Sequence, residues 1–143
     1  MLAILTFLNA GCPGRMPGSS FDSHQVDVFG VAMGTTTDYQ TIRGVKGVDE
    51  PCLRGFERSF DKLDIVVGYG RDGKIRKIIT RNPQNSLFGV HPGEALTPAL
   101  VRIHDAGFIE DGTPCRFNRE GYVLTILNDG NGRLFGMILE ASE

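Results

Sequence analysis

The sequence contains no tryptophan, only three histidines and three cysteines, and no block of basic residues. Its formal net charge is −2, whereas a nucleic-acid-binding protein normally carries a positive footprint, so that class is disfavoured. The nineteen glycines among 143 residues occur singly or in short clusters, which favours many tight connections over long helices. The length fits one ordinary domain, or two very small subdomains that share a core.

The N-terminus carries a short apolar run, Leu2–Leu8, that is too short to cross a bilayer as a helix. The run has the length of the hydrophobic region of a secretory signal and leads into Asn9-Ala10-Gly11-Cys12. This stretch resembles the lipobox of bacterial lipoproteins, in which the cysteine is acylated, although no Lys or Arg precedes it and Asn9 replaces the usual small or apolar residue. The resemblance implies lipidation at Cys12 and a membrane contact through that anchor.

We therefore expect residues 1–12 to be the remnant of an export signal and residues 13–25, rich in Pro, Gly and Ser, to be a linker. The protein would then be secreted or held in a bacterial cell envelope. In the alternative interpretation, residues 2–8 form a β-strand of the fold and the protein is cytoplasmic.

Residues 26–143 show internal self-similarity. The pattern F-G-V-x-x-G begins at Phe29 and again at Phe88, 59 positions later, and Asp72-Gly73 is matched by Asn131-Gly132 at the same shift. Pro51-Cys52 and Pro114-Cys115 are 63 positions apart. Because loops tolerate length changes better than paired elements, these matches predict a single domain of two diverged repeats, about 26–84 and 85–143.

Each repeat is predicted to contain a helix. Leu96, Leu100 and Ile103 fall on one stripe of a helix over residues 94–106, which ends at Gly107. In the first repeat, hydroxyl and carboxylate side chains at residues 35–38 are candidate N-caps for a short helix over residues 39–45. The glycines of the two F-G-V-x-x-G patterns are expected to form the turns that enter these helices: Gly30, Gly34, Gly89 and Gly93.

Each repeat is also predicted to end in a β-hairpin. Residues 63–67 and 74–80 flank the Asp72-Gly73 turn, and residues 122–127 and 134–139 flank a second turn with Asn131-Gly132. The second hairpin is apolar on both faces and should lie at the centre of a sheet, whereas Arg76 and Lys77 suit an edge for the first.

This order of glycine turn, short helix, variable loop and hairpin resembles the β-lactamase-inhibitor-protein-like fold and the small outer-membrane lipoproteins of the OmlA/SmpA type. The resemblance covers about residues 26–143. It implies an α+β fold of two pseudo-repeated helix–β-hairpin units that share one antiparallel sheet with the helices on one face. It implies no catalytic signature.

The candidate chemical sites are weak. Gly68–Gly73 spells G-x-G-x-x-G, but the short, Ile-rich segment that follows suits a hairpin better than a nucleotide-binding helix. The histidines, His24, His91 and His104, lack metal-ligand spacing. We expect no cofactor and no metal.

The Pro-Cys match places Cys52 and Cys115 at equivalent points of the two repeats, and in an oxidising compartment a disulfide between them would join the units. Two unpaired, half-buried thiols are the alternative. Residues 53–60 contain side-chain types that are enriched at interfaces, namely Arg54, Phe56, Arg58 and Phe60. In the alternative, Phe56 and Phe60 belong to a strand and pack inward.

From these features we expect an exported, lipid-anchored, non-enzymatic module that binds another protein and no nucleic acid. One alternative is a small enzyme or ligand-binding protein that uses Cys52 or Cys115 with His91 and needs a reactive thiol. The other is a cytoplasmic immunity or adaptor protein.

Overall fold

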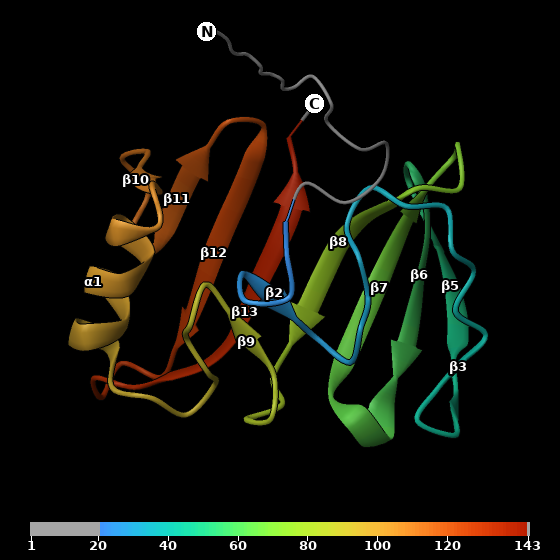
Figure 1. The fold of residues 1–143 in the computed structure, drawn as a ribbon, viewed down its shortest axis with the longest axis horizontal. Coiled ribbons are helices and arrows are strands. Elements are labelled where there is room, and N and C mark those ends of the chain that lie inside the picture. The colour runs from blue at the N-terminus through green and yellow to red at the C-terminus, as the bar shows by residue number, and fades with distance from the viewer. Residues whose placement is uncertain (1–20, 143) are drawn as a thin grey trace, which may run out of the picture.

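The protein folds around one large antiparallel sheet. The computed structural model describes residues 21–142 (Figure 1). Eight strands pair in the following order: β10 (Ile109–Glu110), β11 (Arg116–Arg119), β12 (Tyr122–Asn128), β13 (Leu134–Ala141), β8 (Ile75–Thr80), β7 (Ile65–Gly70), β6 (Gly55–Phe60) and β5 (Val48–Cys52). The remaining elements are two small ladders, β2 (Val26–Asp27) with β9 (Ser86–Leu87) and β3 (Thr41–Ile42) with β4 (Val45–Lys46), the helix α1 (Leu96–Asp105) and a 3₁₀ turn, Asp61–Leu63.

This architecture overturns the expected α+β fold of two helix–hairpin units with helices on one sheet face. The described residues contain a single α-helix, and the fold is mostly β. Each half of the sheet is a four-stranded meander, β5 to β8 and β10 to β13, and the two halves meet where β8 pairs with β13.

The missing helix is the one expected over residues 39–45. These residues instead contribute to the β3–β4 hairpin, whose turn residues Arg43 and Gly44 have φ angles of 49° and 77°. Two consecutive positive φ angles define the type I′ turn that matches the twist of a two-residue hairpin. Gly44 and Gly47 also disfavour a helix, and no apolar stripe at helical spacing compensates for them. The turn at Gly30 and Gly34 therefore leads into a segment without regular secondary structure and then into β3, not into a helix.

The second predicted helix is present. α1 buries Ala99 and Ile103 and is followed by Gly107 at φ 96°. Leu96 and Leu100 pack against the core from the same helix. The turn containing Gly89 and Gly93 precedes α1, as expected for a helix-entry turn.

Both predicted hairpins are also present, as β7–β8 and β12–β13. Their geometry matches closely: the pairs Val66–Ile79 and Thr125–Ile138 are 59 positions apart, and each hairpin has a register irregularity, at Gly68/Tyr69 and at Leu127/Asn128. The expectation that the first hairpin lies at an edge is wrong, because β8 pairs with both β7 and β13.

The two F-G-V-x-x-G turns adopt the same conformation. Phe29 and Phe88 have φ angles of 53° and 55°, and the glycine that follows each has a φ of 80° or 79°. The amide of Gly34 donates to the carbonyl of Ile75, and the amide of Gly93 donates to the carbonyl of Leu134, both at 2.8 Å. Each turn is thereby fixed to the start of the second strand of its hairpin.

The core lies on one side of the sheet. In Figure 1, β2 and β9 cross in front of β13 and β8. Fully buried side chains come from the sheet (Phe60, Ile78, Leu139), from α1 (Ile103) and from the connecting segments (Val28, Val90, Phe108). Residues 21–25, within the expected linker, form a turn on Asp22, and Phe21 contacts Phe88 and Tyr122.

The β8–β13 junction should be sensitive to truncation on its core side. Leu139 is fully buried in β13, and Leu139→Ala should lower the free energy of unfolding by about 2–5 kcal/mol because it leaves a cavity. Phe135→Ala in the same strand is the control, since 46% of Phe135 is exposed. Urea unfolding of both variants checks this, and equal losses would contradict the assigned faces of β13.

Candidate functional site

The second face of the sheet is lined by alternate residues that point away from the core. The pairing register places Ser59, Val66, Ile79, Ile138, Thr125 and Arg116 in one row across β6, β7, β8, β13, β12 and β11. A second row runs through Glu57, Gly68, Lys77, Glu140 and Val123. We call this surface the open face, because no described helix or strand covers it.

Apolar side chains occupy the middle of the open face. Val66, Ile79 and Ile138 are neighbours in the first row, and all three are only half-buried. Val48, at the β5 edge of this row, is 64% exposed. Core residues of the same strands are fully buried, so the two faces of the sheet differ sharply in their contact with solvent.

A hollow of about 520 Å³ is set into the open face. It is lined by the tip of the β5–β6 hairpin, which includes Cys52 and Arg54, and by residues of β7, β8, β12 and β13. Charged residues around it include Arg76, Lys77 and Arg116. The hollow thus combines apolar wall with four cationic residues and the carboxylates of Glu57 and Glu140.

Glycine forms part of the floor of the hollow. A Cβ atom at Gly68 would lie 2.9 Å from the Cβ of Lys77, and one at Gly70 would lie 2.5 Å from the Cδ of Arg76. Glycine inside a strand weakens it, and it often marks a place where another group approaches the backbone closely. Here the groups that approach are the side chains of the neighbouring strand β8.

Lys77 uses the space above Gly68. Its Nζ donates to Glu57 Oε2 at 2.6 Å, although β7 lies between the two strands that carry these residues. Burial lowers the pKa of Lys77, but the hydrogen bond to Glu57 and the charges of Glu57 and Glu140 outweigh it, so the pKa is raised overall. Lys77 is therefore held as a cation between two carboxylates.

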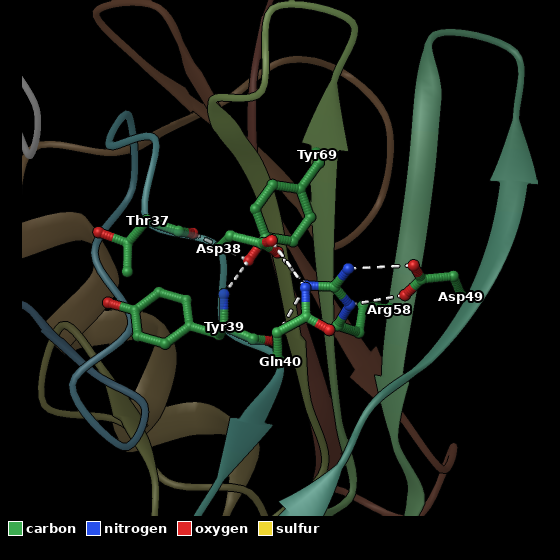
Figure 2. A network of polar contacts seen from close by, with 7 residues as sticks. All are labelled: Thr37, Asp38, Tyr39, Gln40, Asp49, Arg58 and Tyr69. Carbon is green, nitrogen blue, oxygen red and sulfur yellow. Dashed lines mark hydrogen bonds and ion pairs between the residues drawn. The ribbon is translucent and has the colours of Figure 1, made fainter.

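A second polar cluster lies on the core side, around Arg58 (Figure 2). The guanidinium makes a bidentate contact with Asp49, through Nε at 2.6 Å and Nη2 at 3.0 Å. Its Nη1 donates to Asp38 at 2.5 Å and to the carbonyl of Tyr39 at 3.0 Å. Arg58 is 5% exposed, so these bonds compensate a charge that is nearly removed from water.

Tyr69 completes this cluster. Its ring stacks on Phe56 with centroids 4.8 Å apart, and the Arg58 guanidinium carbon lies 5.3 Å from the Tyr69 centroid. The hydroxyl donates to the Thr37 carbonyl and accepts from the Tyr39 amide, both at 3.0 Å. Burial raises the pKa of Tyr69, so the phenol remains a donor at neutral pH. The cluster fastens residues 37–39 to β5, β6 and β7.

The Arg58 cluster should make stability depend on acid. Its hydrogen bonds hold the pKa of Asp38 and of Asp49 below the usual value. Below about pH 4 the unfolded chain takes up protons on these groups before the folded chain does, so the free energy of unfolding should fall as the pH decreases through the folded-state pKa values. Urea unfolding at several pH values measures this.

Asp49→Asn should flatten that pH dependence, because it removes one of the two carboxylates. Glu110→Gln, at an exposed position of β10, is the control and should leave the dependence in place. A wild-type profile that stays flat as the pH falls below 4 would contradict the assigned ion pairs.

The four predicted interface residues fall into two groups that differ in their burial. Arg54 is exposed, and Phe56 is half-buried; both line the hollow. Arg58 and Phe60 are 5% and 0% exposed and face the core. The alternative interpretation, an inward-facing strand, therefore describes residues 56–60 better, because β6 is an interior strand of the sheet.

The two described cysteines do not occupy equivalent positions. Cys52 ends β5 and is exposed, whereas Cys115 precedes β11 and is half-buried. At the 59-residue offset, Ile126 of β12 corresponds to Val67 of β7. Val67 pairs with Arg58, and the amide of Ile126 donates to the carbonyl of Cys115, so Cys115 corresponds to Arg58 and not to Cys52. Both thiols are free, so the possible Cys52–Cys115 disulfide is not formed in the structure, and the alternative of two unpaired thiols applies.

Both cysteines should therefore react as free thiols. Denatured, unreduced protein should alkylate at Cys52 and at Cys115, as read by mass spectrometry of peptides. In the native protein, Cys52 should react first, because Cys115 is half-buried and its sulfur accepts from Asn128 Nδ2 at 3.2 Å. A peptide pair that is released only by reductant would contradict the free thiols.

The histidines lie apart from both thiols. His91 Nδ1 contacts the carbonyl of Pro83 at 3.0 Å, His24 lies in the turn on Asp22, and His104 is exposed on α1. Within residues 21–142, no hydrogen bond joins a cysteine to a histidine, and no group of three potential ligands could hold a metal ion. The lipidation site, Cys12, lies outside the described residues.

Comparison with known proteins adds no assignment. No protein-family model, no curated protein and no solved structure matches this chain. None of the helices in the described part of the chain is long and apolar enough to span a bilayer.

Sequence reasoning missed the open face and its hollow. A signal was present in the G-x-G of residues 68–70, which interrupts an apolar strand at two positions on one face. The pattern was interpreted only as part of a turn. The charge of Lys77 predicts an edge strand, whereas Lys77 pairs with Glu57 within the sheet.

Proposed function

We propose that this chain is a non-enzymatic protein-binding module that uses the open face of its sheet. The observation that carries the proposal is the half-buried apolar row of Val66, Ile79 and Ile138 on a face that no described element covers. Interfaces combine an apolar centre with a polar rim in which arginine is enriched.

The exposed apolar residues support this choice of surface. Five large hydrophobic side chains of the described chain are exposed, and three of them border the open face: Val48, Leu53 and Ile109 are 64%, 84% and 66% exposed. Val48 and Ile109 lie on the two edge strands, and Leu53 lies at the β5–β6 tip. Because these three residues lie far apart on the rim, they extend the apolar surface to the borders of the open face, and the central row carries the proposal.

The proposal extends to export and lipid anchoring through Cys12, on the strength of residues 2–12 alone. It also includes an origin of the two halves from one ancestral unit, which the matched bulges and the 59-residue offset of the hairpin pairs favour. The resemblance to β-lactamase-inhibitor-like proteins belongs with these proposals. The α-helix that this resemblance implies in the first unit is absent from the described residues.

Photo-crosslinking in the native source cells tests the binding surface. A photoreactive phenylalanine at Ser59 or Thr125, two half-buried positions in the same row of the open face, should form an adduct with one and the same protein. Val101, 57% exposed on α1, is the control position and should not give that adduct.

Replacing Ile79 with Lys in the Thr125 derivative should remove the adduct, because a charge would enter the apolar row. Circular dichroism checks that the variant remains folded. Adducts that are equally strong at Val101, or the absence of a discrete adduct at both open-face positions, would overturn the proposed function.

A further inference from the structure

We propose that the hollow recognises an acidic segment of the partner protein, whose carboxylates bind the arginines of the β5–β6 and β7–β8 turns. This inference rests on the proposed function, and it names the chemistry of the partner. A second hollow, of about 440 Å³, lies beside the first. It shares the lining residues Leu53, Arg54 and Arg76 with the first hollow and is also lined by Arg71. The two hollows are therefore neighbours, and we refer to them together as the depression.

The charge of this depression differs from that of the chain. The first hollow is lined by four cationic residues, Arg54, Arg76, Lys77 and Arg116, and by two carboxylates, Glu57 and Glu140. The second is lined by three arginines and a leucine, with no acidic residue. Asp72 lies beside Arg76 and Asp111 pairs with Arg116, so the depression and these partners hold five cations and four carboxylates. The whole chain has a net charge of −2, so a small excess of positive charge lies at this surface.

The arginines are partly preorganised. Arg71 Nη2 donates to the carbonyl of Leu53 at 3.0 Å, which connects the two turns, and Arg76 lies 4.0 Å from Asp72. Gly70 leaves the space in which the Arg76 stem crosses β7. A guanidinium presents several N–H donors in a fixed plane that fits a carboxylate in bidentate fashion.

The apolar parts of the depression favour a polypeptide as the source of these carboxylates. Leu53, 84% exposed, lines both hollows, and Val123 lines the first from the open face of β12. An extended acidic segment presents side chains of both kinds, whereas a phosphate backbone or a lipid surface presents mainly charge at this point. The ligand that fits the depression is therefore an acidic peptide segment.

Fluorescence anisotropy with the full chain tests the inference. The probe is a labelled peptide of alternating Glu, Ser and Leu, and its matched control has Gln at every Glu. The Glu peptide should bind about tenfold more tightly, because charge-assisted hydrogen bonds are stronger than neutral ones. Added salt should reduce the difference.

Charge reversal locates the site. Arg54→Glu with Arg71→Glu should weaken binding of the Glu peptide about tenfold or more. Lys46→Glu with Lys62→Glu makes the same charge change at exposed positions outside both hollows and should leave the affinity unchanged. If the Glu pair unfolds the protein, Arg54→Gln with Arg71→Gln replaces it, with the same expected direction.

The two proposals fail separately. Equal affinity for the Glu and Gln peptides, with the Ser59 and Thr125 adducts intact, overturns the acidic-partner inference and leaves the binding surface in place. Stronger binding of a single-stranded oligonucleotide or of phosphatidylglycerol vesicles than of the Glu peptide, lost in the arginine variants, also overturns it. Loss of the adducts overturns the proposed function itself.

Discussion

The structure depends on the pairing of β8 with β13. Each meander alone would leave a long edge of unpaired backbone groups, and this junction converts the two into one eight-stranded sheet. Four residue pairs form it, with Ile78–Leu139 and Thr80–Met137 facing the core and Ile79–Ile138 facing the open side. Thr80 is buried there and bonds to Asn85, which fixes the chain as it leaves β8.

A one-sided core follows from how the chain is used outside the sheet. The segments that could cover a sheet face, α1 and the connections before β5 and after β8, all contribute buried residues to the same core cluster. No described element remains to cover the other face. The Arg58 cluster strengthens the covered side by binding residues 38 and 39 to β5 and β6, so the open face is supported by a rigid layer beneath it.

The sequence contained enough information for the local elements and too little for their assembly. Asp72-Gly73 and the apolar segments around it predicted a hairpin because turn chemistry is local. The stripe of Leu96, Leu100 and Ile103 predicted α1 for the same reason. The N-cap candidates at residues 35–38 predict a helix over residues 39–45, but the Arg43-Gly44 turn makes part of this segment a hairpin instead.

Errors about position came from non-local pairing. Arg76 and Lys77 indicated an edge strand, and only the register shows that Glu57, two strands away, compensates Lys77 inside the sheet. The match of Pro51-Cys52 with Pro114-Cys115 suggested equivalent cysteines. In the strand pairing, Cys115 instead occupies the place in the second half that Arg58 occupies in the first. The Pro-Cys match therefore does not mark a shared structural position.

The asymmetry between the two halves explains why the hollow lies where it does. At an offset of 59, Gly68 and Gly70 of β7 correspond to Leu127 and Asp129, although the paired registers of the hairpins coincide. The second half thus carries side chains at the two positions where the first half has glycine. Because glycine within a strand lowers stability, two glycines in an interior strand need a compensating role. Accommodating Lys77 and Arg76, and with them the depression of the open face, supplies that role.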